Sequence, residues 1–140
     1  MADAAPDRLS APVVPRHKLP ELYALAAVRE EAFANGTTPP PGVRLADADT
    51  HRGQAAGFEA ASVALQSHRR LADAVDMLRR LGNRLELRSD ETIDPAWREG
   101  YLRAVDDAVQ TIERTLAAEQ FDAARERRLE RRVMRIEMRR

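Results

Sequence analysis

Apolar side chains after residue 50 recur at alternating steps of three and four residues, the spacing of one buried helical face. This pattern predicts a long helix that begins after Asp49 or Thr50, either of which can cap it, and ends at Gly82-Asn83. Its expected seam is Phe58, Ala61, Leu65, His68, Ala72, Val75 and Leu78. A further helix is predicted to begin at Asp94-Pro95, since aspartate caps helices and proline suits their first position. The same spacing continues there through Leu102, Val105, Val109, Ile112 and Leu116.

The first 50 residues have a different pattern, because seven of the eight prolines lie before residue 42. We expect a flexible arm rich in proline and alanine over residues 1–19. A short helix is predicted from Pro20 to Asn35-Gly36, followed by a proline-rich connector up to residue 50. The apolar side of this helix is predicted to comprise Leu22, Leu25, Ala26, Val28 and Ala32. Residues 51–140 then form a helical hairpin with a charged C-terminal extension.

A short internal repeat relates the two arms of the predicted hairpin. Gly57-Phe58 and Gly100-Tyr101 each stand near a helix start, and an alanine follows one turn later in both copies. A glycine without a side chain lets two helices approach closely, while the neighbouring ring fills the adjacent space. The repeat therefore predicts a pseudo-symmetric helical hairpin, and the chain as a whole is expected to be all-α, with a short first helix before the hairpin.

The last predicted helix is longer than a compact domain of this size. No glycine or proline follows Gly100, so a helix from Pro95 to Arg140 reaches about 69 Å at 1.5 Å per residue. A 140-residue domain has a radius of gyration of about 14 Å, and hence a diameter of roughly 40 Å. We therefore predict an antiparallel, coiled-coil-like hairpin whose C-terminal helix projects from the body.

Charge is unevenly distributed along that helix, although the chain as a whole is neutral with 23 basic and 23 acidic residues. Residues 89–124 contain three arginines and nine acids, whereas residues 125–140 contain eight arginines and three glutamates. Zero net charge excludes a globally basic nucleic-acid binder. Because the basic end has no evident partner within its own fold, we expect it to pair with another copy of the chain or with another helical protein.

The basic end is also amphipathic, which leads to the main functional hypothesis. Leu129, Val133 and Ile136 fall within one 60° stripe of a helix, and Met134 and Met138 lie elsewhere on the same segment. Together these five side chains are the predicted partner interface. The hypothesis is a non-enzymatic interaction or assembly protein that acts through its C-terminal helix and self-associates.

Alternative interpretations remain open. Arg128, Arg131, Arg132, Arg135 and Arg139 form a basic band that would contact phosphates in a nucleic-acid-associated protein. Against this, residues 125–140 contain no aromatic side chain that could stack on a base, and glutamates interrupt the arginines. A solvated helix end explains the same charges without a partner. The composition is also typical of small phage or mobile-element accessory proteins.

Residue types that carry chemistry are sparse. Cysteine is absent, and no phosphate-binding glycine loop or serine nucleophile motif occurs, so we predict no catalytic residue, no cofactor and no enzyme activity. Asp47, Asp49 and His51 are closely spaced oxygen and nitrogen donors, but a helix cap explains them without a metal. Neither a signal peptide nor a membrane span is apparent, and we expect a cytoplasmic protein that does not bind membranes.

Overall fold

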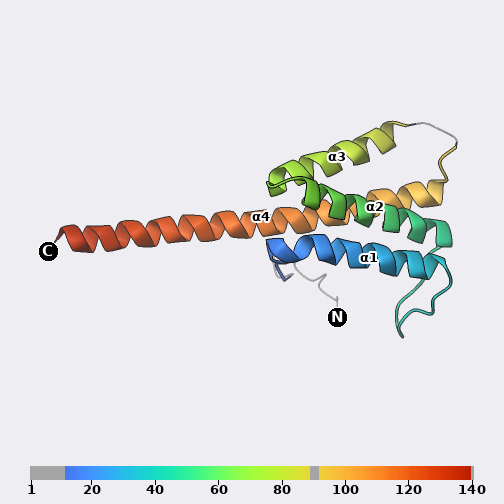
Figure 1. Ribbon diagram of the computed structural model, residues 1–140, viewed down its shortest axis with the longest axis horizontal. Coiled ribbons are helices and arrows are strands. Elements are labelled where there is room, and N and C mark those ends of the chain that lie inside the picture. The colour runs from blue at the N-terminus through green and yellow to red at the C-terminus, as the bar shows by residue number, and fades with distance from the viewer. Residues whose placement is uncertain (1–11, 89–91, 140) are drawn as a thin grey trace, which may run out of the picture.

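The computed structural model describes residues 12–88 and 92–139. Within these residues a 3-10 turn, η1 (Arg16–Lys18), precedes four α-helices and there is no strand. The helices are α1 (Leu19–Ala34), α2 (Ala48–Ser67), α3 (Leu71–Leu87) and α4 (Pro95–Met138). The structure thus confirms an all-α fold with a short first helix, a helical hairpin and a projecting C-terminal helix (Figure 1).

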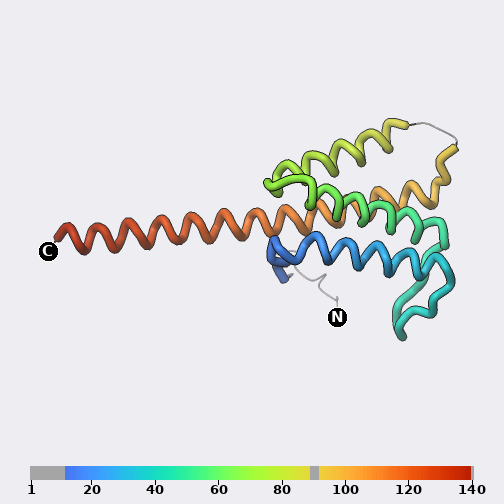
Figure 2. Tube along the Cα trace, viewed as in Figure 1, coloured from blue at the N-terminus to red at the C-terminus, as the bar shows by residue number. Residues whose placement is uncertain are grey.

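The helices form a body in which α1 packs on α2, α2 packs on α4, and α4 packs on α3. The chain reverses direction at each connection from α1 to α4, as the colour sequence in Figure 2 shows. Helices α3 and α4 are therefore antiparallel, as predicted for the hairpin arms. Helices α2 and α4 run in the same direction, which a two-helix hairpin does not produce.

The parallel helices α2 and α4 approach each other closely at three glycines, of which Gly57 and Gly100 belong to the repeat and Gly53 does not. A side-chain carbon on Gly57 would lie 2.7 Å from Cβ of Ala104 and 2.8 Å from the carbonyl oxygen of Tyr101. Carbons added at Gly53 and Gly100 would overlap backbone of the facing helix, at Trp97 and Thr50 respectively. Small residues let the two backbones come this close, which confirms the close approach predicted from the repeat.

The hydrophobic core lies between the helices and is built mainly of alanine and branched aliphatic side chains. Fully buried side chains come from every helix of the body and include Leu19, Ala61, Ala74, Leu78, Ala108 and Ile112. The rings of Tyr23 and Phe58 stack across the α1–α2 contact with centroids 5.8 Å apart. The predicted α4 seam is confirmed, because Val105, Val109 and Ile112 are all buried.

The predicted single helix over residues 51–81 is wrong, because it is divided into α2 and α3. His68 and Arg70 have extended backbone, so the chain turns between Ser67 and Leu71. This turn carries no glycine or proline, and it shifts the buried face so that Ala72, expected in the seam, is exposed. The predicted end at Gly82-Asn83 is also wrong: Gly82 remains helical and α3 continues to Leu87.

Two local predictions in the N-terminal half also need correction. Of the predicted apolar side of α1, Leu22, Leu25 and Val28 are exposed, whereas Leu19, Tyr23 and Glu30 are buried. Glu30 is buried because it meets His51, a pairing that local periodicity does not contain. Asp47, and not Asp49 or Thr50, is the residue that precedes α2, and its side chain makes no capping bond.

The predicted start of α4 is found. The Asp94 carboxylate accepts hydrogen bonds from the backbone N–H groups of Ala96 and Trp97, and Pro95 occupies the first turn. The helix then continues without a break to Met138, and its last third extends well beyond the other helices (Figure 1). Residues 1–11 of the predicted arm lie outside the described residues.

Candidate interaction surface on the projecting helix

Residues 120–138 of α4, called the tail from here on, are accessible from all sides. Thr115 is the last buried residue of the helix, and from Gln120 to Arg139 every side chain is exposed except the half-buried Ala124. Leu129, Val133 and Ile136 keep 50%, 54% and 56% of their surface exposed. These three residues, called the apolar stripe, therefore lie on solvent-exposed helix and belong to no core of the described chain.

The apolar stripe continues one edge of the buried side of α4, the edge on which Gly100, Ala104 and Thr115 lie. At 100° per residue, the side buried in the body leads along the tail to Glu126, Glu130 and Glu137, called the glutamate row. The apolar stripe is rotated from the glutamate row by roughly 75°. If the body were longer by several turns, the glutamate row would lie at the centre of the buried side, and the stripe would lie at the edge where Gly100 and Ala104 contact α2.

Arginines occupy the side of the tail that faces away from the buried side. The arginine row consists of five residues spaced by three and four: Arg125, Arg128, Arg132, Arg135 and Arg139. Arg125 was missing from the predicted band, although its spacing was readable, and Phe121 lies one turn before it on the same side. Arg131 lies at the margin of the row.

The glutamates interrupt the arginines in the sequence but not on the helix surface. The glutamate row and the arginine row are roughly 160° apart around the axis. Met134 and Met138, predicted as interface residues, are exposed and lie more than about 120° from the centre of the apolar stripe. One partner helix on the stripe would therefore not reach the two methionines.

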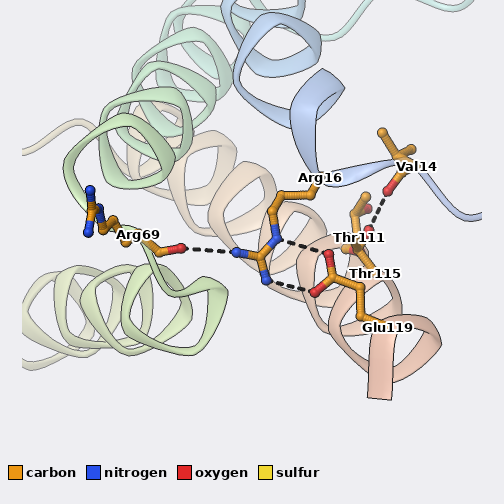
Figure 3. A network of polar contacts seen from close by, with 6 residues as sticks. All are labelled: Val14, Arg16, Arg69, Thr111, Thr115 and Glu119. Carbon is orange, nitrogen blue, oxygen red and sulfur yellow. Dashed lines mark hydrogen bonds and ion pairs between the residues drawn. The ribbon is translucent and has the colours of Figure 1, made fainter. Parts of the chain in front are cut away.

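The base of the tail is fixed to the body by a network that joins three segments (Figure 3). The Arg16 guanidinium donates to both carboxylate oxygens of Glu119, at 2.9 and 2.7 Å, and to the carbonyl oxygen of Arg69 at 3.0 Å. The Thr115 hydroxyl donates to the carbonyl oxygen of Val14 at 2.6 Å. Residues 14–16, the α2–α3 turn and α4 are thus tied together where α4 leaves the body, so the direction of the tail is set.

This network also shifts the titration of its charged pair. The hydrogen bond from Arg16 lowers the pKa of Glu119 below its ordinary value, and the same bond raises the pKa of Arg16. Both side chains are partly exposed, at 46% for Arg16 and 40% for Glu119, so solvent screens the pair. The pair contributes more to the orientation of the segments than to overall stability.

A second surface feature is a groove of about 450 Å³ between α1 and α4, lined by eleven residues that include Tyr23, Thr111, Asp107 and Arg114. Burial raises the pKa of Tyr23 to about 12 and raises the pKa of Asp107, an effect that Arg114 opposes. Tyr23 is therefore a neutral hydrogen-bonding group at physiological pH. The groove is open and mostly apolar, and its lining contains no cysteine, serine or histidine to serve as nucleophile or base.

His51, considered in the sequence together with Asp47 and Asp49, is a structural residue. Its Nε2 atom accepts from the backbone N–H of Ala46 at 3.0 Å, so its Nδ1–H donates to Glu30 at 2.6 Å. Asp49 pairs instead with Arg52 at 2.8 Å. Over residues 12–88 and 92–139, no three carboxylate, imidazole or thiol side chains gather as metal ligands.

Trp97 is half-buried at the start of α4, with its ring stacked on that of Tyr101 at 5.2 Å between centroids.

Comparisons of the chain with protein-family models, curated proteins and solved structures find no match. Among the helices in the described part of the chain, none combines the length and apolarity needed to cross a membrane.

Proposed function

We propose that this chain is a non-enzymatic helical interaction protein whose tail docks on another helix through the apolar stripe. The observation that supports this is an apolar stripe on exposed helix that no other element of the described chain covers. Three branched aliphatic side chains at steps of four and three fit the facing surface of one helix. A solvated helix end gains nothing from placing them on one side.

A second copy of the chain is the first partner to consider, and the body restricts how it can approach. Val133 follows Thr115 by five full turns, so both project from the same side of α4. Thr115 faces Val14, and segment 14–16 occupies that side at the base of the tail. A second copy lying parallel on the stripe would bring its own body into this segment. Self-association therefore requires antiparallel tails, with the two bodies at opposite ends.

Antiparallel pairing has a consequence for charge. In two antiparallel helices, each flank of the contact meets the same flank of the partner. The glutamate row would then face glutamates and the neighbouring arginines would face arginines. Self-association is thus expected to strengthen as salt screens this repulsion. A different helical protein with complementary flanks would show the opposite dependence on salt.

The experiment is the solution mass of the full chain by size-exclusion chromatography with light scattering, over a range of protein and salt concentrations. We expect a rise from 15.7 kDa toward twice that mass with increasing protein and salt. Leu129→Asp should hold the mass at one chain, because a carboxylate at the contact would be buried without a partner. Ala123→Asp is the matched control, since it adds the same charge to the tail about 120° away from Leu129.

Two outcomes would count against the proposal. If the full chain stays at one-chain mass under all these conditions, the tail does not serve self-association and the partner must be a different helix. If Leu129→Asp lowers the unfolding temperature of the body while Ala123→Asp does not, the stripe is part of the core. That second result would remove the proposed function altogether.

A further inference from the structure

The arginine row is a second surface of the tail, which adjoins the apolar stripe at Leu129. The centres of the two surfaces lie about 90° apart around the helix axis. A partner helix on the stripe therefore leaves most of the row accessible. None of the ion pairs found among the described residues involves an arginine of the row. Five guanidinium groups thus stand together without carboxylates to neutralise them.

We propose that the arginine row binds the phosphate backbone of duplex nucleic acid. The row extends over 15 residues, from Arg125 to Arg139, or about 21 Å between the first and the last. A duplex presents about 12 phosphate charges over that length, which is more than the five arginines can neutralise. The row is straight and lies on exposed helix, so all five side chains can reach a duplex at once.

The shape of the tail supports the same partner. An α-helix with its side chains is about 10–12 Å across, and the major groove of a duplex is about 12 Å wide. Because every side chain from Phe121 to Arg139 is at least partly exposed, no other element of the described chain blocks the approach. The network of Arg16 and Glu119 at the base fixes the direction in which the tail leaves the body.

The charge density of the row favours a polyphosphate over an acidic protein. The centres of protein–protein interfaces are depleted of charged residues and contain apolar anchors. Two apolar side chains adjoin the row, Phe121 at its base and Leu129 at its edge, and both line a hollow with Arg125, Arg128, Arg132 and Arg135. The use of arginine in place of lysine says nothing about the partner, because 22 of the 23 basic residues of the whole chain are arginine. The regular spacing of the five arginines, their exposure and the lack of ion pairs to them among the described residues favour a polyphosphate.

The experiment measures binding of the full chain to a fluorescein-labelled 24-base-pair DNA duplex by anisotropy, as a function of salt. Five phosphate contacts predict a slope of about −4.5 for log K against log salt, and hence about a 500-fold loss of affinity between 50 and 200 mM. The variant R128Q/R132Q/R135Q should bind at least roughly tenfold more weakly at 50 mM, with the slope reduced to about −1.8.

The matched control is R70Q/R80Q/R84Q, which removes the same charge from α3 and its preceding turn. It should retain both the affinity and the slope, and circular dichroism verifies that both variants keep their helices. The proposal is overturned if the full chain does not bind the duplex at 50 mM salt, or if both triple variants weaken binding equally. Equal affinity for poly-L-glutamate would also overturn it, because the row would then be a general polyanion surface.

Discussion

The body and tail segments of α4 belong to one uninterrupted helix with the same apolar spacing, yet they use it differently. In the body, the spacing places Val105, Val109 and Ile112 in the core. In the tail, it places Leu129 and Val133 in solvent, although Val133 projects from the same side as buried Thr115, and glutamates continue the centre of the buried side. Periodicity therefore establishes that a helix has an apolar side. It does not establish that this side faces the rest of its own chain.

The two segments should differ most in how much stability is lost when an apolar side chain is shortened. Ile112→Ala should lower the free energy of unfolding by about 3 kcal/mol, because it leaves a cavity at a fully buried site. Val133→Ala should change it by less than about 0.5 kcal/mol, since the side chain is exposed and alanine favours helix. Urea unfolding of both variants, followed by circular dichroism, measures the two values. Similar losses at both sites would mean that the tail packs on the body.

The close contact of α2 and α4 in the body gives the next effect. Gly100→Ala should destabilise the chain by about 2 kcal/mol, because the added carbon overlaps the backbone at Thr50. Gly82→Ala is the control, since the nearest atoms to its added carbon are side-chain carbons at 3.7 and 3.9 Å. That substitution should raise stability by about 0.5–1 kcal/mol through helix propensity. The unfolding temperatures of the two variants measure these effects, and an unchanged temperature for Gly100→Ala would contradict the close contact of α2 and α4.

The smallest effect is expected at the border of the two segments, where Arg16 meets Glu119. Because the pKa of Glu119 is lowered in the folded chain, its contribution to stability is present at neutral pH and is lost as pH falls below about 4.5 through that lowered pKa. Arg16→Ala should therefore cost less than about 1 kcal/mol at pH 7, with the difference from wild type shrinking in acid. Arg103→Ala, which removes an exposed pair within α4, serves as control in the same unfolding series. A difference that grows in acid would be inconsistent with the pairing.

Local signals predicted the elements of the fold well. The Asp94-Pro95 start, the Asn35-Gly36 end of α1 and the length of α4 each depend on residues close in sequence, and each is found. The glycine repeat predicted the close helix approach, because a missing side chain has the same effect wherever the partner lies. The tail arginines were found for the same reason, since an exposed row needs only helical spacing to be recognised.

The remaining features depend on contacts between distant residues. The turn after α2 has no breaking residue, and its Arg69 carbonyl is held by Arg16 from 53 positions away. Glu30 could not be assigned to the buried side of α1 without knowing that His51 meets it. The apolar residues of α1 and of the tail each form one side of a helix. The sequence could not show whether such a side packs on the rest of the chain or stays exposed.

The most direct test of the account is to end the chain after Gln120 and measure its unfolding at a protein concentration where the full chain is a monomer. If the tail serves a partner and not the fold, the shortened chain should unfold cooperatively, with a free energy of unfolding within about 1 kcal/mol of the full chain. Loss of cooperative unfolding, or a fall of several kcal/mol, would contradict the account, because the tail would then be part of the body's core.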